Sequence, residues 1–91
     1  MDVGKLQARI DAALIDPQSR LNWWYSSPYL SSLAVDLQDK LRKAANEGGL
    51  EAMLDEFDRL AQVEDSDRLR IALAQVLFND PVRQRLGLRL P

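Results

Sequence analysis

Residues 41–61, "LRKAANEGGLEAMLDEFDRLA", hold the pattern that decides the fold. The apolar residues on both sides of the two glycines recur at spacings of three and four, which places them on one face of a helix. Paired glycines end a helix readily, because glycine adopts the positive φ that commonly follows a helix C-terminus. The stretch therefore predicts one helix that ends at Gly48 and Gly49, and a second helix that begins at Leu50.

The same helical spacing covers the rest of the chain, and no segment alternates apolar and polar residues for long enough to predict a strand. Because the connections are short, successive helices should pack as antiparallel neighbours. We therefore predict an all-α protein, a compact bundle of four main helices plus one or two short helices. The four stripes are Leu6, Ile10, Ala13 and Leu14; Leu30, Leu33, Ala34, Leu37, Leu41 and Ala44; Leu50, Met53, Leu54, Phe57, Leu60 and Ala61; and Leu69, Ala72, Leu73 and Val76.

Helix starts are marked by a capping residue followed by proline. A side-chain oxygen of Asp or Ser accepts from the free amides of the first turn, and proline suits the first helical position because it lacks an amide. Asp65 or Ser66 should cap the fourth helix in the same way. The three marked pairs are Asp16 with Pro17, Ser27 with Pro28, and Asp80 with Pro81.

Length and composition indicate one small soluble protein. The 91 residues are 46% hydrophobic and 29% charged, and we expect a single helical domain over residues 1–91. No apolar run approaches the roughly 18 residues that span a bilayer. The first residues lack a basic start followed by an apolar block, so we expect no secretory signal. Cysteine is absent, which excludes disulfides and fits a cytoplasmic location.

The residue types needed for common catalytic sites are missing. The chain has no histidine, and none of its four glycines forms a phosphate-binding loop. Asp55, Glu56 and Asp58 lie off the apolar stripe and should form a solvated face. The three acids of residues 64–67 lack the spacing of a calcium loop, and they suit a helix N-terminus. We therefore predict no enzymatic activity, no cofactor, no metal and no small-molecule substrate.

Charge is unevenly distributed, although the net charge is only −2. Residues 47–67 contain eight acidic residues against Arg59 alone, whereas residues 68–91 contain five arginines against Asp80. One hypothesis is internal, with the acidic helix lying beside the arginine-rich C-terminal part. The other is external, with the acidic face meeting a basic partner and the arginines gripping an acidic one. The sequence leaves both open.

The segment of residues 20–32, "RLNWWYSSPYLSS", contains both tryptophans and both tyrosines. On a helix, Trp23 and Trp24 point about 100° apart, so they cannot share one narrow core stripe. Trp24 and Tyr29 could plug the bundle where a short helix crosses a long one. Alternatively, the cluster beside Arg20 is an interface, because Trp, Tyr and Arg dominate energetically important contacts between proteins.

The C-terminus, "RQRLGLRLP" at residues 83–91, alternates leucine and arginine. A short helix should end at Gly87, after which the chain is expected to be extended. Leaving its leucines in water would be unfavourable, so we expect the tail to dock on its own bundle or on another chain.

These features favour a non-enzymatic protein–protein interaction module: a small adaptor, inhibitor, chaperone or anti-activator that masks or bridges another protein. A homodimer is compatible with the same surface. The alternatives are a helix-turn-helix-like DNA-binding regulator and a structural subunit of a larger assembly. We do not expect nucleic-acid binding, because three acids crowd the start of the would-be recognition helix. The predicted partner-binding residues are Arg20, Trp23, Tyr25, Tyr29, Arg83 and Arg85.

Overall fold

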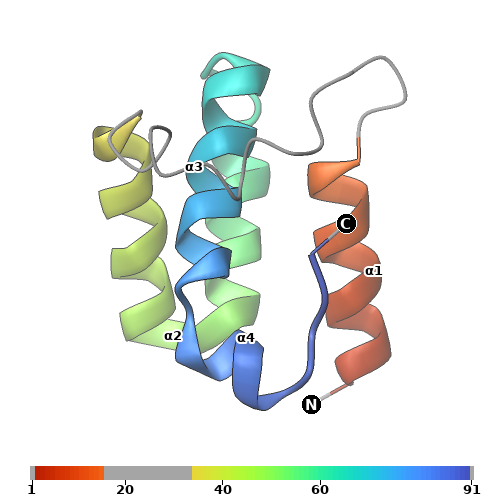
Figure 1. The fold of residues 1–91 in the computed structure, drawn as a ribbon. Helices are drawn as coiled ribbons and strands as arrows, with labels where there is room; N and C mark the ends of the chain where they lie inside the picture. The colour runs from red at the N-terminus through yellow and green to blue at the C-terminus, as the bar shows by residue number, and fades with distance from the viewer. Residues whose placement is uncertain (1, 16–33, 91) are drawn as a thin grey trace.

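The computed structural model describes residues 2–15 and 34–90, and this part of the chain contains four helices and no strand (Figure 1). The all-α prediction is confirmed for these residues. The predicted number of four main helices is wrong, because only three helices of seven or more residues are present here. The two apolar stripes on either side of the paired glycines, which predicted separate helices, belong to the single element α2. The helices are α1 (Val3–Leu14), α2 (Val35–Leu60), α3 (Ser66–Phe78) and α4 (Pro81–Arg85).

A sharp turn at Gly49 folds α2 back on itself. Gly49 has φ 79° and ψ −166°, values that are far from helical and that are accessible to glycine almost alone. As Figure 1 shows, residues 35–48, the first arm, and residues 50–60, the second arm, run side by side in opposite directions. The chain therefore turns where the paired glycines predict it, although both arms count as one helix.

The predicted caps of α3 and α4 are confirmed. Asp65, rather than Ser66, caps α3, and Asp80 caps α4 with Pro81 at the first helical position. In each case the carboxylate accepts hydrogen bonds from backbone N–H groups that have no partner within the helix. The N···O distances are 3.0 Å from Arg68, 2.7 Å from Val82 and 3.3 Å from Arg83.

The start of α2 differs from the prediction. The apolar spacing predicted a helix that runs through Ala34, but this residue has a left-handed backbone with φ 53° and ψ 41°, and α2 begins at Val35. A left-handed residue cannot continue a right-handed helix, and it costs an alanine about 1–2 kcal/mol. The helix starts predicted at Asp16 and Ser27 lie outside the described residues.

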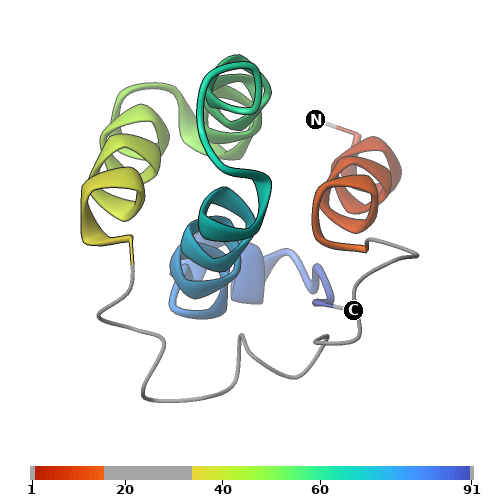
Figure 2. The same cartoon turned by 90° about the horizontal axis from the view of Figure 1, so that it is seen from above.

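α3 is the central helix of the described bundle. Figure 2 shows it enclosed by α1 and by both arms of α2. Six of its apolar side chains are at most 5% exposed, which is more than one stripe would bury. A helix with apolar residues on most of its circumference is stable only when neighbours surround it. The core residues contributed by the other helices are Leu6, Ile10 and Leu14 of α1, and Leu37, Leu41, Leu50, Met53, Leu54 and Leu60 of α2.

We expect Gly49→Ala to lower the free energy of unfolding by about 1–3 kcal/mol, because alanine is strained at this φ and ψ. A Cβ atom at Gly49 would have no heavy atom within 4 Å, so crowding does not contribute to the loss. Urea denaturation measures the change. Asn46→Ala, at an exposed position of the first arm, is the control and should change stability by no more than about 0.5 kcal/mol. Equal stability of the two variants would contradict the assigned turn.

Candidate functional site

The two flanks of α1 bring together polar side chains that are distant in the sequence. Gln7 and Arg9 are separated by about 200° around the helix, so they lie on opposite sides of the stripe formed by Leu6, Ile10 and Leu14. Arg9 reaches the second arm of α2, and Gln7 reaches residues 86–90, which we call the tail. Both flanks are candidate sites for interactions with other molecules.

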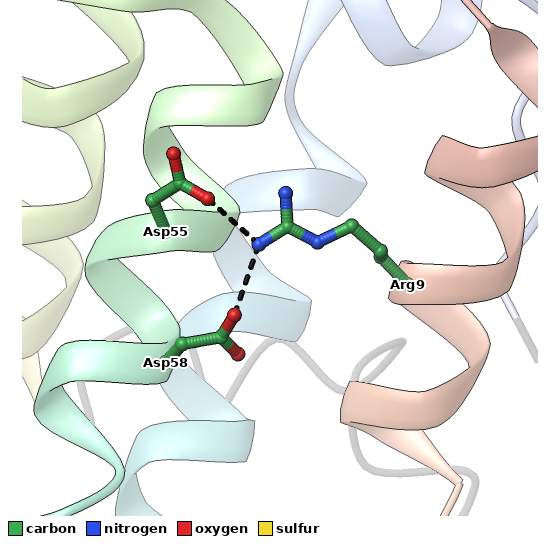
Figure 3. A network of polar contacts seen from close by, with 3 residues as sticks. All are labelled: Arg9, Asp55 and Asp58. Atoms are coloured by element: carbon green, nitrogen blue, oxygen red, sulfur yellow. Dashed lines mark hydrogen bonds and ion pairs between the residues drawn. The ribbon is translucent and has the colours of Figure 1, made fainter.

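Arg9 bridges two carboxylates of the second arm (Figure 3). Its Nη2 atom lies 2.9 Å from Asp55 Oδ1 and 3.0 Å from Asp58 Oδ2. Burial alone would lower the pKa of the Arg9 guanidinium, but the hydrogen bonds and the charges of the two aspartates outweigh it and raise the pKa above its usual value. The two aspartates therefore favour the charged form of Arg9.

The bridge leaves the second arm acidic. One guanidinium faces two carboxylates, and the side chains of Asp55 and Asp58 remain 73% and 70% exposed. Glu51 is also exposed on the second arm, and Glu47 is exposed at the end of the first arm, just before the turn. An ion pair this open to solvent is worth only about 0–1 kcal/mol. The acidic face is therefore a surface feature that orients α1 and leaves negative charge available to a partner.

The internal hypothesis for the charge pattern holds only in part. The acids of the second arm pair with Arg9 near the N-terminus, which the sequence analysis did not single out. From the arginine-rich C-terminal part, Arg68 pairs with Asp36 in the first arm at 3.0 Å. Arg70 also pairs with Asp67 of the acidic stretch, three residues earlier in α3. The two charged regions therefore find internal partners partly in each other and partly elsewhere in the chain.

The tail docks on its own bundle, one of the two outcomes expected from its leucines. Gln7 Nε2 donates to the backbone oxygen of Arg89 at 2.8 Å, and the Arg89 backbone N–H donates to Gln7 Oε1, also at 2.8 Å. Gln7 also donates to Asp11 Oδ1 at 2.9 Å, which fixes the orientation of the amide. Leu88 is 2% exposed and belongs to the core.

Arg83 fastens the tail to the end of α3. Its guanidinium donates to the backbone oxygens of Leu77 at 2.7 Å, Leu88 at 2.9 Å and Phe78 at 3.1 Å. The last carbonyls of a helix lack partners and carry partial negative charge, so a cation is favourable there. Sequence reasoning missed this contact, because it depends on how the chain turns after α3.

The predicted partner-binding residues fall into three groups. Arg20, Trp23, Tyr25 and Tyr29 lie outside the described residues, so their role stays a prediction. Arg83 is half-buried and directs its guanidinium to backbone carbonyls of its own chain. Arg85, on the same short helix, is exposed. A partner-binding role of Arg83 and Arg85 stays a prediction.

Three hollows lie on the described surface, and each is open to solvent. The first, of about 270 Å³, lies beside the turn at Gly49 and has an apolar floor that includes Leu50 and Val76. The second, of about 220 Å³, lies between α1 and the second arm beneath Arg9. The third, of about 280 Å³, lies where the tail meets α1 and is lined by Gln7, Asp11, Ile15, Arg89 and Leu90.

The remaining tests of function gave no match. Within residues 2–15 and 34–90, no group of three or more His, Cys, Asp or Glu side chains could hold a metal ion. Every helix in these ranges is too short or too polar to cross a lipid bilayer. No protein-family model, curated protein or solved structure matches the chain.

We expect Arg83→Ala to lower the free energy of unfolding by about 2 kcal/mol, because a charged donor to several carbonyls is lost. Arg85→Ala is the matched control on the same helix and should change stability by no more than about 0.5 kcal/mol. Chemical denaturation measures both. Amide hydrogen exchange should also become faster at Arg89 in the Arg83→Ala variant, because the tail is then held less firmly. Equal stability and equal exchange at Arg89 in the Arg83→Ala and Arg85→Ala variants would show that Arg83 does not hold the tail.

Proposed function

We propose that the chain is a small non-enzymatic protein–protein interaction module. It would act as an adaptor, inhibitor, chaperone or anti-activator that masks or bridges another protein. We place this activity in the cytoplasm, since a chain without cysteine suits a reducing compartment.

The observation that carries the proposal is a set of exposed apolar side chains at one end of the bundle. Ile15 is 48% exposed, Val35 46% and Val63 75%. They belong to the end of α1, the start of α2 and the turn between α2 and α3, which Figure 1 shows at the same end. Figure 2 shows these three segments on different sides of the bundle, so a partner that covered all three side chains would span this whole end.

The aromatic segment begins and ends at this surface. Residues 16–33 follow Ile15 and precede Ala34, so both of their attachment points lie beside the exposed apolar side chains. We propose that Arg20, Trp23, Tyr25 and Tyr29 form the centre of the interface. Large aromatic side chains and arginine supply most of the binding energy in such interfaces.

The acidic second arm would guide the approach of the partner. Negative charge on a surface raises the rate of association with a basic protein more than it raises affinity. The carboxylates of Asp55 and Asp58 keep most of their exposure even though Arg9 contacts both. The partner is therefore expected to present a basic rim around an apolar or aromatic-binding centre.

The DNA-binding alternative has less support. A recognition helix must expose one face to the major groove. In α3, the apolar residues from Leu69 to Leu77 are buried at the centre of the bundle, and Asp65 and Asp67 are exposed at its start. A mobility-shift titration with duplex DNA at low salt would detect this activity, and we expect no shift.

We expect Trp23→Ala combined with Tyr25→Ala to reduce capture of the partner from an extract of the native host by at least tenfold, since hot-spot truncations cost about 2 kcal/mol or more each. Phe78→Ala is the matched control, because Phe78 is 44% exposed at the other end of α3 and should leave capture unchanged. Quantitative mass spectrometry of the captured proteins measures the ratio.

Unchanged capture by the aromatic double variant, with a wild-type circular dichroism spectrum, would remove the proposed interface. Light scattering of the free chain tests the remaining alternative, a structural subunit of a larger assembly. A structural subunit would assemble with itself as the concentration rises, whereas a masking or bridging module is complete as a monomer or a dimer.

A further inference from the structure

We propose that the surface that holds the tail is a binding site for an extended peptide segment of another protein, and that the tail fills it as a tethered substitute. This tail groove consists of Gln7, Asp11 and Ile15 along α1, together with Arg83 of α4. It shares Ile15 with the exposed apolar set of the proposed interface, but Gln7, Asp11 and Arg83 lie outside that set, so variants at Gln7 and at the aromatic residues test the two sites independently.

The first observation is that Gln7 recognises backbone rather than side chain. Its amide gives one hydrogen bond to the carbonyl of Arg89 and receives one from the N–H of the same residue, each at 2.8 Å. An adjacent β-strand offers an extended segment the same pair of contacts. The side chain of Arg89 is exposed. Any residue other than proline could therefore take this position in an extended conformation.

The second observation is that Leu88, the residue just before Arg89, acts as an anchor. Leu88 is 2% exposed within the core, and its carbonyl accepts from Arg83 Nη1 at 2.9 Å. Peptide sites commonly combine main-chain hydrogen bonds with a pocket for alternate side chains. The groove therefore selects an apolar side chain of leucine size, followed by any residue other than proline in an extended conformation.

The third observation is a hollow between the tail and α1, lined on the tail side by Arg89 and Leu90. This hollow of about 280 Å³ runs beside Gln7, Asp11 and Ile15, and Ile15 is 48% exposed at its far end. Figure 1 shows the tail running beside α1 in the same direction. Four helical residues rise about 6 Å, close to the length of two extended residues. Alternate residues of a longer peptide would therefore face Gln7, Asp11 and Ile15 in turn.

The spacing of Gln7, Asp11 and Ile15 along α1 predicts which residues the partner segment should carry. Two residues after the one paired with Gln7, a backbone N–H would face Asp11, whose carboxylate can accept more than the one hydrogen bond from Gln7. Residue 91 of this chain is proline, which has no N–H to donate. A segment with leucine at the anchor, a residue other than proline three positions later and an apolar residue five positions later therefore fits this register.

The tail would compete with such a partner. Gly87 has φ 70°, and a Cβ atom there would meet nothing within 4 Å, so the tail leaves α4 through a glycine turn in open space. A segment attached through a short connection has an effective concentration in the millimolar range. A peptide in solution should therefore bind weakly to the wild-type chain and more tightly once the anchor leucine of the tail is removed.

The test measures binding of the fluorescent peptide GLRLARL by fluorescence polarisation to two full-length chains, wild type and Leu88→Ser. We expect the Leu88→Ser chain to bind at least tenfold more tightly, because the competing anchor is gone. In that background, Gln7→Ala should weaken binding about tenfold, as expected for the loss of two hydrogen bonds. Gln62→Ala, at an exposed position in the turn between α2 and α3, is the matched control and should have no effect.

The peptide itself is varied in the same assay. GLRLPRL, with proline opposite Asp11, should bind about fivefold more weakly than GLRLARL, which is the expected effect of one missing hydrogen bond. GSRLARL, without the anchor leucine, should lose most of its affinity. Equal binding of the peptide to both chains, or an unchanged affinity in the Gln7→Ala variant, would overturn the proposal.

A second measurement covers the case in which Leu88→Ser does not fold. Wild-type chain is titrated with GLRLARL to millimolar concentration and followed by NMR spectroscopy. We expect the side-chain NH₂ of Gln7 and the amide of Arg89 to shift before other signals. Shifts confined to other residues, or none, would refute the groove. Wild-type dimers that Leu88→Ser abolishes would identify the occupant as the tail of a second copy, which also rejects a partner peptide.

Discussion

The turn at Gly49 is the constraint on which the described structure depends. It occupies a region of φ and ψ that no residue with a Cβ atom adopts without strain, and it reverses the direction of α2 within one residue. Both arms can then pack on α3, which would otherwise expose apolar side chains on several faces. The burial of Leu73 and Leu77 at the centre therefore depends on a backbone feature more than 20 residues earlier.

α1 joins this frame by two kinds of contact with different roles. Leu6, Ile10 and Leu14 are at most 8% exposed, and full burial of a side chain of this size contributes about 1.5–3 kcal/mol. The ion pair of Arg9 contributes at most about 1 kcal/mol at its exposure. Apolar burial therefore holds α1 in place, whereas Arg9 and Gln7 determine how the helix is rotated and which groups its flanks offer to other molecules.

The sequence was sufficient for features that depend on local pattern. Spacings of three and four predicted the buried faces of α1, α3 and the second arm, and the Asp65 and Asp80 caps follow from residue type and position. It was not sufficient for contacts between distant residues. Gln7 and Arg89 lie 82 positions apart, and nothing in the periodicity of either segment identifies the other. The left-handed backbone of Ala34 also has no signal in the sequence, because alanine ordinarily favours a right-handed helix.

The same limit applied to the candidate sites. Aromatic and arginine content indicated residues 20–32, Arg83 and Arg85 as candidate sites. Composition could not show that Arg83 binds backbone carbonyls of its own chain, whereas Arg85 faces solvent. The tail groove was missed because its main recognition group is a glutamine, a residue type that rarely stands out. Polar residues at the edges of an apolar stripe, such as Gln7 and Arg9, are the signal that would have found both flanks of α1.

Hydrogen–deuterium exchange of the chain alone and bound to its captured partner tests the central claim most directly, namely that α3 forms a fixed centre and that partners bind the end of the bundle beside the aromatic segment. We expect binding to slow exchange in residues 16–33 and in the second arm, while α3, already the most protected helix, stays unchanged. Slowing confined to the first arm and α4, with residues 16–33 unaffected, would contradict this description of how the protein works.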